Sequence, residues 1–120
     1  MARILICEPV EETRELLERL VDRMGHVIVG IEDLESIDVL VFDPGSAAGR
    51  ALARRAVEVC PNASLVACSA EPSRARQPTT PGVVATLLQP FSPADLSRAL
   101  IACGLPPARG GSIARDLSGG

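Results

Sequence analysis

The stretch ILICEPVEETRELLERLVDRMGH, residues 4–26, contains the signals of a buried strand followed directly by an amphipathic helix. Residues 3–7 are a short apolar run with β-branched side chains, which is typical of a strand covered on both faces in a parallel sheet. Glu8 and Pro9 end this run, and Pro9 is expected at the first position of the helix. Gly25 is expected to end the helix in the C′ position. The apolar side chains between them recur at helical spacing: Leu16, Leu17, Leu20, Val21 and Met24.

The alternation of strands and helices continues along the chain. Further strands are predicted over residues 27–31, 38–43, 63–70 and 83–88, and further helices over residues 47–60 and 93–103. The link 32–37 is too short for a full helix, so the second helix is expected to be reduced to a single turn or a loop. This order of elements predicts an α/β fold with a doubly wound parallel sheet.

Two segments lack a clear pattern. Residues 71–82 contain three prolines, and each proline inside a helix costs about 3 kcal/mol, so a weak fourth helix or a loop is expected there. Residues 105–120 are rich in Gly, Pro, Ser and Arg and show no periodicity. We therefore expect one domain over residues 1–104 and a disordered tail or linker over residues 105–120.

The composition excludes several classes of function. All twelve basic residues are arginine, which excludes lysine Schiff-base chemistry and a phosphate-loop lysine. Two Phe are the only aromatic side chains, and the net charge is −3, so we expect no nucleic-acid partner. No leader pattern opens the chain and no apolar run approaches the length of a membrane span, so no membrane contact is predicted and the cytoplasm is the expected location.

The four cysteines and the single histidine do not form a metal-binding pattern. Cys7, Cys60, Cys68 and Cys103 lie in no CxxC or Cys/His spacing, and three of them stand in apolar contexts. We expect small buried thiols in a reducing compartment, with no disulfide framework. His26 follows a glycine turn and is expected at the surface or at a strand edge.

Charge is unevenly distributed along the chain. Residues 1–45 contain eleven acids and four Arg, a balance of −7, whereas residues 46–120 contain four acids and eight Arg, a balance of +4. Two interpretations remain open: the halves steer a charged partner, or they are ordinary solvated faces.

Polar residues follow four of the predicted strands. They are Glu8, Asp43, Ser69 and Gln89. In a doubly wound sheet the carboxyl ends of the strands meet at one edge, where ligands and catalytic groups collect, so we expect these side chains to lie together.

With these residues in place, the chain resembles the receiver domains of two-component response regulators over residues 3–104. The resemblance rests on residues 4–26 and on three later motifs: DVLVFDPG at 38–45, SLVACSA at 64–70 and GVVATLLQPFSPADLSRAL at 82–100. It implies a flavodoxin-like five-stranded parallel sheet of order 2-1-3-4-5. It also implies a signalling module, not an enzyme, whose partner is a histidine kinase or another signalling protein, and a homodimer through the last helix and the last strand.

The resemblance assigns roles to individual residues. It implies that Asp43 is the phosphoacceptor and that the Ser69 hydroxyl hydrogen-bonds the phosphoryl group. It implies that Glu8, Asp43 and the backbone carbonyl of Gly45 hold Mg²⁺. A carboxylate that attacks an anionic phosphoryl donor needs such a cation and a fixed positive charge to offset the charge on the oxygens.

Three positions depart from the family pattern. Pro9 stands where the family has a second acid, and Gln89 stands where it has lysine. A neutral hydrogen bond from Gln89 is worth about 1 kcal/mol, whereas a charge-assisted one is worth about 1.5–3 kcal/mol. Thr86 takes the place of the family's aromatic switch residue. Mg²⁺ binding and phosphorylation are therefore both expected to be weakened.

Three hypotheses follow. The first is a degenerate receiver, or pseudo-receiver, that acts by protein contact with impaired or absent phosphorylation of Asp43. The second is an atypical but active phosphoacceptor in a phosphorelay. The third is a flavodoxin-like domain that binds a small ligand or acts as an enzyme; against it, no glycine-rich phosphate loop follows the first strand.

Overall fold

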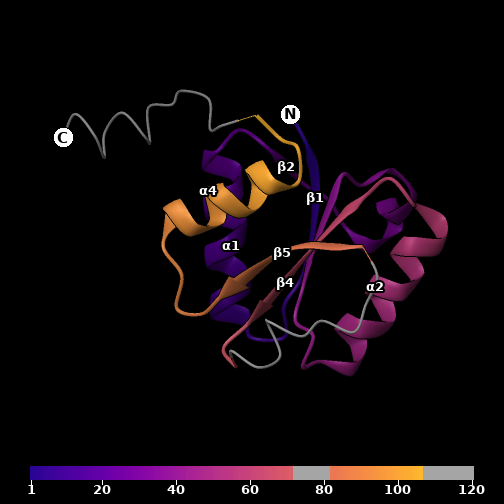
Figure 1. The fold of residues 1–120 in the computed structure, drawn as a ribbon, viewed down its shortest axis with the longest axis horizontal. Helices are drawn as coiled ribbons and strands as arrows, with labels where there is room; N and C mark the ends of the chain where they lie inside the picture. The colour runs from indigo at the N-terminus through magenta and orange to yellow at the C-terminus, as the bar shows by residue number, and fades with distance from the viewer. Residues whose placement is uncertain (72–81, 107–120) are drawn as a thin grey trace.

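The computed structural model of the chain describes residues 1–71 and 82–106. Five parallel strands form one sheet in the order β2-β1-β3-β4-β5, which confirms the predicted topology (Figure 1). The strands are β1 (Arg3–Cys7), β2 (Val27–Ile28), β3 (Val39–Phe42), β4 (Ser64–Ser69) and β5 (Val83–Leu88). All four residues of the central strand β3 are buried, as expected for a strand covered on both faces.

Helices cover both faces of the sheet. They are α1 (Glu11–Arg23), the 3₁₀ helix η1 (Ile31–Ser36), α2 (Ala47–Val59) and α4 (Pro93–Ala102). Leu17 of α1 and Leu96 of α4 belong to one apolar core, whereas Leu34 of η1 and Ala53 of α2 belong to a second core on the other face. Figure 1 shows α1 and α4 on one side of the strands and α2 on the other.

Helix α4 begins as its sequence predicts. The Ser92 hydroxyl accepts a hydrogen bond from the Asp95 amide, and the Asp95 carboxylate accepts one from the Ser92 amide, so the two residues form a capping box. Pro93 occupies the first turn, and Gly104 follows the helix with φ of 87°, a conformation that favours glycine.

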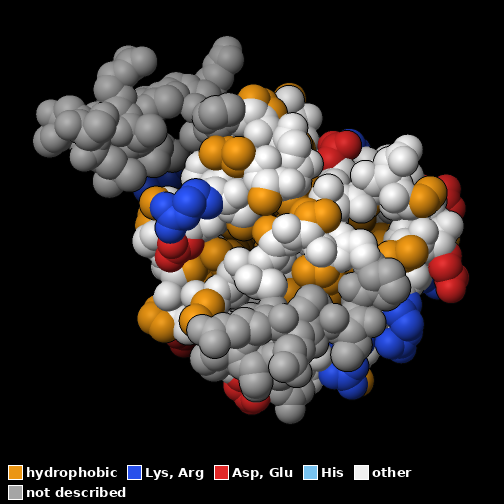
Figure 2. All heavy atoms as spheres, in the orientation of Figure 1, with side chains coloured by type: hydrophobic (Ala, Val, Ile, Leu, Met, Phe, Trp, Pro, Cys, Tyr) orange, Lys and Arg blue, Asp and Glu red, His pale blue; other side chains and the backbone are white. Residues whose placement is uncertain are grey.

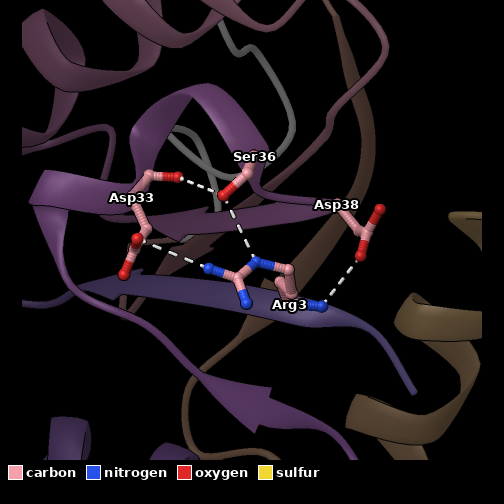
Figure 3. A network of polar contacts seen from close by, with 4 residues as sticks. All are labelled: Arg3, Asp33, Ser36 and Asp38. Atoms are coloured by element: carbon pink, nitrogen blue, oxygen red, sulfur yellow. Dashed lines mark hydrogen bonds and ion pairs between the residues drawn. The ribbon is translucent and has the colours of Figure 1, made fainter.

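A polar network holds η1 against the sheet (Figure 3). The Arg3 guanidinium lies 3.4 Å from the Asp33 carboxylate, and its Nε donates to the Ser36 hydroxyl over 3.3 Å. The Arg3 amide donates to the Asp38 carboxylate over 2.8 Å. One residue of β1 therefore contacts both η1 and the residue directly before β3, and so fixes the short link that replaces a full helix.

Three local predictions were wrong. Strand β2 spans only two residues instead of 27–31, because it pairs with β1 alone and η1 begins at Ile31. Pro9 is not the first residue of α1, which begins at Glu11 after a bend at Pro9. His26 precedes the edge strand β2, so its predicted place at a strand edge holds, but its predicted place at the surface is wrong: the side chain is buried, and its Nδ1 accepts a hydrogen bond from the Ala2 amide over 3.1 Å.

The cysteine prediction is confirmed for one thiol. Cys68 is buried, whereas Cys7, Cys60 and Cys103 are half-buried, and all four are free. No helix within residues 1–71 and 82–106 is long and apolar enough to cross a bilayer. The weak fourth helix expected in 71–82 and most of the tail expected in 105–120 lie outside the described residues, and the domain boundary at 104 stays a prediction.

Buried His26 predicts a loss of stability at low pH. Burial, together with the charged N-terminal amino group, lowers the pKa of His26, and Asp38 opposes this shift. The unfolded chain therefore binds a proton more tightly than the folded chain, and stability present above about pH 6.5 falls as the pH drops through that value.

We expect urea unfolding to show a smaller free energy of unfolding at pH 5.5 than at pH 7.5. These two values lie about one unit either side of the ordinary pKa of histidine in an unfolded chain. The variant His26→Asn offers an oxygen near the Nδ1 position without titrating in this range, so its pH dependence is expected to be flatter. Equal slopes for the two proteins would contradict the assignment to His26.

Candidate functional site

The carboxyl ends of β1 and β3 bring two carboxylates side by side. Cys7 of β1 pairs in register with Phe42 of β3, so the next residues, Glu8 and Asp43, leave neighbouring strands at the same edge of the sheet. Their charges interact: the Asp43 carboxylate raises the pKa of Glu8. The predicted convergence of these two acids is therefore observed.

Glu8 is buried and held by two donors. Its Oε2 accepts a hydrogen bond from the Val10 amide over 3.0 Å, and its Oε1 accepts one from Gln89 Nε2 over 3.2 Å. Burial raises the pKa of Glu8, and the two hydrogen bonds partly offset that shift. The bond to the Val10 amide also explains the late start of α1, because the chain turns at Pro9 before the helix begins.

Gln89 joins the ends of three strands. Its backbone amide donates to the Ser69 carbonyl over 2.9 Å, and its side-chain Nε2 lies 3.2 Å from Glu8 Oε1 and 3.4 Å from Cys68 Sγ. Burial raises the pKa of the Cys68 thiol to about 12, so it is a neutral core thiol at pH 7, as the sequence predicts. The residue at the expected lysine position thus contacts Glu8, one of the two acids, with a neutral amide.

Asp43 lies in a tightly built turn. Its Oδ1 accepts a hydrogen bond from the Gly45 amide over 2.8 Å, and its carbonyl oxygen accepts one from the Ser46 amide over 3.0 Å. Ser46 then caps α2, because its hydroxyl accepts from the Gly49 amide over 3.1 Å. Asp43 is half-buried, so its carboxylate is held at the surface by backbone contacts.

Gly49 is a structural residue of the site that the sequence analysis did not single out. A Cβ atom at Gly49 would lie 2.6 Å from the Asp43 carbonyl oxygen. Only a glycine lets the first turn of α2 approach the Asp43 turn this closely. No sequence pattern marks this position, since a glycine three residues into a helix has no distinctive spacing.

Ser69 lies at the predicted strand end but turns its side chain to local backbone. It is buried at the end of β4, and its hydroxyl accepts a hydrogen bond from the Glu71 amide over 3.0 Å. Its role toward a phosphoryl group stays a prediction, as does a metal contact from the Gly45 carbonyl.

The acidic pair fits a weak cation site. Mg²⁺ in phosphate sites takes one or two carboxylates and keeps several waters. Glu8 and Asp43 supply two carboxylates, but both oxygens of Glu8 and one oxygen of Asp43 already accept N–H donors. Within residues 1–71 and 82–106, no group of three or more His, Cys, Asp or Glu side chains is arranged to hold a metal ion.

Comparison with known proteins identifies the fold. No family model and no curated protein sequence matches the chain. A response regulator receiver domain protein from Clostridium thermocellum has a TM-score of 0.71 at 19% identity, covering 86% of this chain and 94% of its own. The receiver domain of the sensor histidine kinase PA1611 from Pseudomonas aeruginosa, with magnesium in its active-site cleft, has a TM-score of 0.68 at 17% identity, covering 87% and 98%.

A third similar structure comes from a different context. The putative pilus assembly protein CpaE from Burkholderia thailandensis has a TM-score of 0.69 at 20% identity, covering 87% of this chain and 98% of its own. Each of the three similarities extends over most of both chains. The chain therefore has the flavodoxin-like fold of response regulator receiver domains.

Proposed function

We propose that this chain is a receiver-like signalling module that acts by protein contact, with impaired or absent phosphorylation of Asp43. The observation that carries the proposal is the hydrogen bond from Gln89 Nε2 to Glu8 Oε1. An amide at this position adds no positive charge beside Asp43, and lysine is absent from the whole chain. The charge that develops on phosphoryl oxygens would therefore lack a fixed cationic partner.

The environment of Glu8 supports the same proposal. Burial and the neighbouring Asp43 charge both raise the pKa of Glu8, so a second charge at this edge is already unfavourable. A phosphoryl group on Asp43 would add further negative charge there. Glu8 and Asp43 are the residues that would hold Mg²⁺, and a bound cation would offset this charge. However, Pro9 stands where receiver domains have a second acid beside the one at Glu8, so one expected carboxylate is missing.

Two partner classes follow from the similar structures. The similarity to the receiver domain of a sensor histidine kinase supports a histidine kinase or another signalling protein as the partner. The similarity to a putative pilus assembly protein supports a component of a protein assembly as the second candidate. The cytoplasm as location and the homodimer through α4 and β5 stay predictions.

Acetyl phosphate labelling tests the proposal directly. The purified chain is incubated with Mg²⁺ and acetyl phosphate, and its intact mass is measured. In a working receiver, an Asp43 carboxylate oxygen attacks phosphorus, an acyl phosphate forms and acetate leaves. We expect no stoichiometric gain of one phosphoryl group.

The alternative hypothesis, an active phosphoacceptor, predicts the opposite result in the same experiment. Asp43→Asn is the matched control, because it keeps the shape of the side chain and removes the nucleophilic carboxylate. A stoichiometric gain in the original chain that disappears in this variant overturns the proposed function.

A further inference from the structure

A groove runs between η1 and α2 on the face of the sheet opposite α1 and α4. Its volume is about 320 Å³, and it is lined by Ile31, Glu32 and Glu35 of η1 and by Arg55 and Val59 of α2. It continues onto a shallow hollow on the outer side of α2, which shares Arg55 and Val59 and adds the charged residues Arg54 and Glu58. We call these seven residues the η1–α2 face.

The centre of the η1–α2 face is apolar and exposed. Ile31 is 62% exposed and Val59 is 37% exposed, although both are large apolar side chains. Figure 2 shows apolar, acidic and basic side chains together at the edge of the molecule that α2 occupies in Figure 1. Burial of such side chains against a partner is favourable at roughly 25 cal/mol per Å² of apolar surface.

The charges of the η1–α2 face are divided unequally between its two elements. The charged side chains from η1 are both acids, Glu32 and Glu35, whereas those from α2 are Arg54, Arg55 and Glu58, with a net charge of +1. Across the described ranges 1–71 and 82–106, none of these five side chains forms an ion pair or a hydrogen bond within the chain. The unequal division follows the charge asymmetry of the sequence, since η1 belongs to the acidic half and α2 to the basic half.

We propose that the η1–α2 face binds a second copy of this chain through a two-fold axis. A two-fold interface joins the same patch on both subunits, so η1 of one copy lies against α2 of the other. This arrangement places the acids of each η1 opposite the arginines of each partner α2, and it brings the exposed Ile31 and Val59 side chains together at the centre. The inference is independent of whether Asp43 is phosphorylated.

The groove at the opposite end of the sheet lacks these properties. It lies between β5 and α4 and has a volume of about 440 Å³. Its two charged lining residues, Asp95 and Arg98, already form an ion pair with each other within α4. The unpaired charges of the η1–α2 face therefore favour that face as the interface between copies over the α4 and β5 surface, where the resemblance to receiver domains places a homodimer.

Charge exchange between two variants tests the proposal. One variant carries Glu32→Arg and Glu35→Arg, which leaves Glu58 as the single acid of the face. The other carries Arg54→Glu and Arg55→Glu, which makes all of its charged residues acidic. Sedimentation equilibrium is expected to show a dimer for the original chain and a dissociation constant raised about 100-fold for each variant alone, because like charges oppose at both ends of the interface.

The mixture of the two variants is the decisive sample. In a mixed dimer, each basic η1 meets an acidic α2 and each basic α2 meets an acidic η1, so dimerisation is expected to recover. Added salt is expected to weaken the original dimer, because it screens exposed charges. Glu12→Arg with Glu15→Arg on exposed positions of α1 is the control and is expected to leave the dimer unchanged.

Circular dichroism of each variant checks that the fold is kept. A monomeric original chain at every concentration measured overturns the proposal. So does a dimer that survives both reversals, which would place the interface elsewhere, such as at β5 and α4. Variants that both dissociate without recovering in the mixture would show a partner of a different geometry and would also overturn it.

Discussion

Replacing Gln89 by lysine and Pro9 by aspartate is expected to convert Asp43 into a phosphoacceptor that acetyl phosphate labels about 100-fold faster than in the original chain, since the loss of one charge-stabilising donor typically costs about 100-fold to 1000-fold in rate. The Gln89 side chain already reaches Glu8 and packs beside Cys68, so a lysine there places its ammonium group beside the acidic pair. The aspartate introduced at position 9 supplies the carboxylate that receiver domains have at this position. Intact mass against time measures the rate.

Single variants separate charge from side-chain shape. Gln89→Met removes both hydrogen bonds of the amide without adding charge, so it is expected to leave labelling at the original level. Pro9→Ala introduces a backbone N–H at position 9 without adding a carboxylate. It therefore separates the loss of proline from the gain of charge, and it is also expected to leave labelling at the original level. Unchanged labelling in the double variant, with the fold intact, would show that the missing charges do not limit the chemistry at Asp43.

Replacing Gly49 by alanine is expected to destabilise the domain by about 1–3 kcal/mol, the usual cost of an added group in a close-packed site. The new Cβ atom would lie 2.6 Å from the Asp43 carbonyl oxygen, and backbone cannot rotate away as a flexible side chain can. The gain in helix propensity from glycine to alanine, about 1 kcal/mol or less, only partly offsets this clash. Guanidinium unfolding measures the change.

The effect of this substitution on the Asp43 turn has its own readout. Movement of the Asp43 carbonyl weakens the bond that it accepts from the Ser46 amide, so hydrogen exchange at Ser46 is expected to accelerate. Ala48→Ser changes an exposed neighbour on the same turn and is expected to stay within about 0.5 kcal/mol of the original chain. Equal stability of the two variants would contradict the close approach of Gly49.

Much of the architecture was predictable because local signals and the fold agree. The buried run of β3 and the capping box at Ser92 and Asp95 appear in the structure where their residue types predict them. Strand β2 was predicted too long, because the apolar character of residues 29–31 does not distinguish a strand from the link to η1 and its first residue. Hydrophobic pattern does not reveal how many neighbours a strand will have.

The candidate site was predictable in part for the same reason. Topology alone brings Glu8 beside Asp43, since consecutive residues after paired strands leave the sheet at one edge. The contacts of Gln89 with Glu8 and Cys68 were not predictable, because they depend on side chains separated by 81 and 21 positions along the chain. The burial of His26 was missed because its partner, the Ala2 amide, is likewise distant in sequence.

By itself, the sequence determined the parallel α/β sheet, the absence of any lysine charge and the polar residues that end its strands. Those properties follow from composition, from short continuous apolar runs and from the helical periodicity of 3.6 residues, which are local. Only the tertiary structure decided that Gln89 donates a hydrogen bond to Glu8, and that Gly49 packs closely against the Asp43 carbonyl oxygen. It also decided that acids and an arginine without ion-pair partners line one partly apolar groove. These arrangements depend on distances between remote segments, and chain folding sets such distances only when the whole core packs.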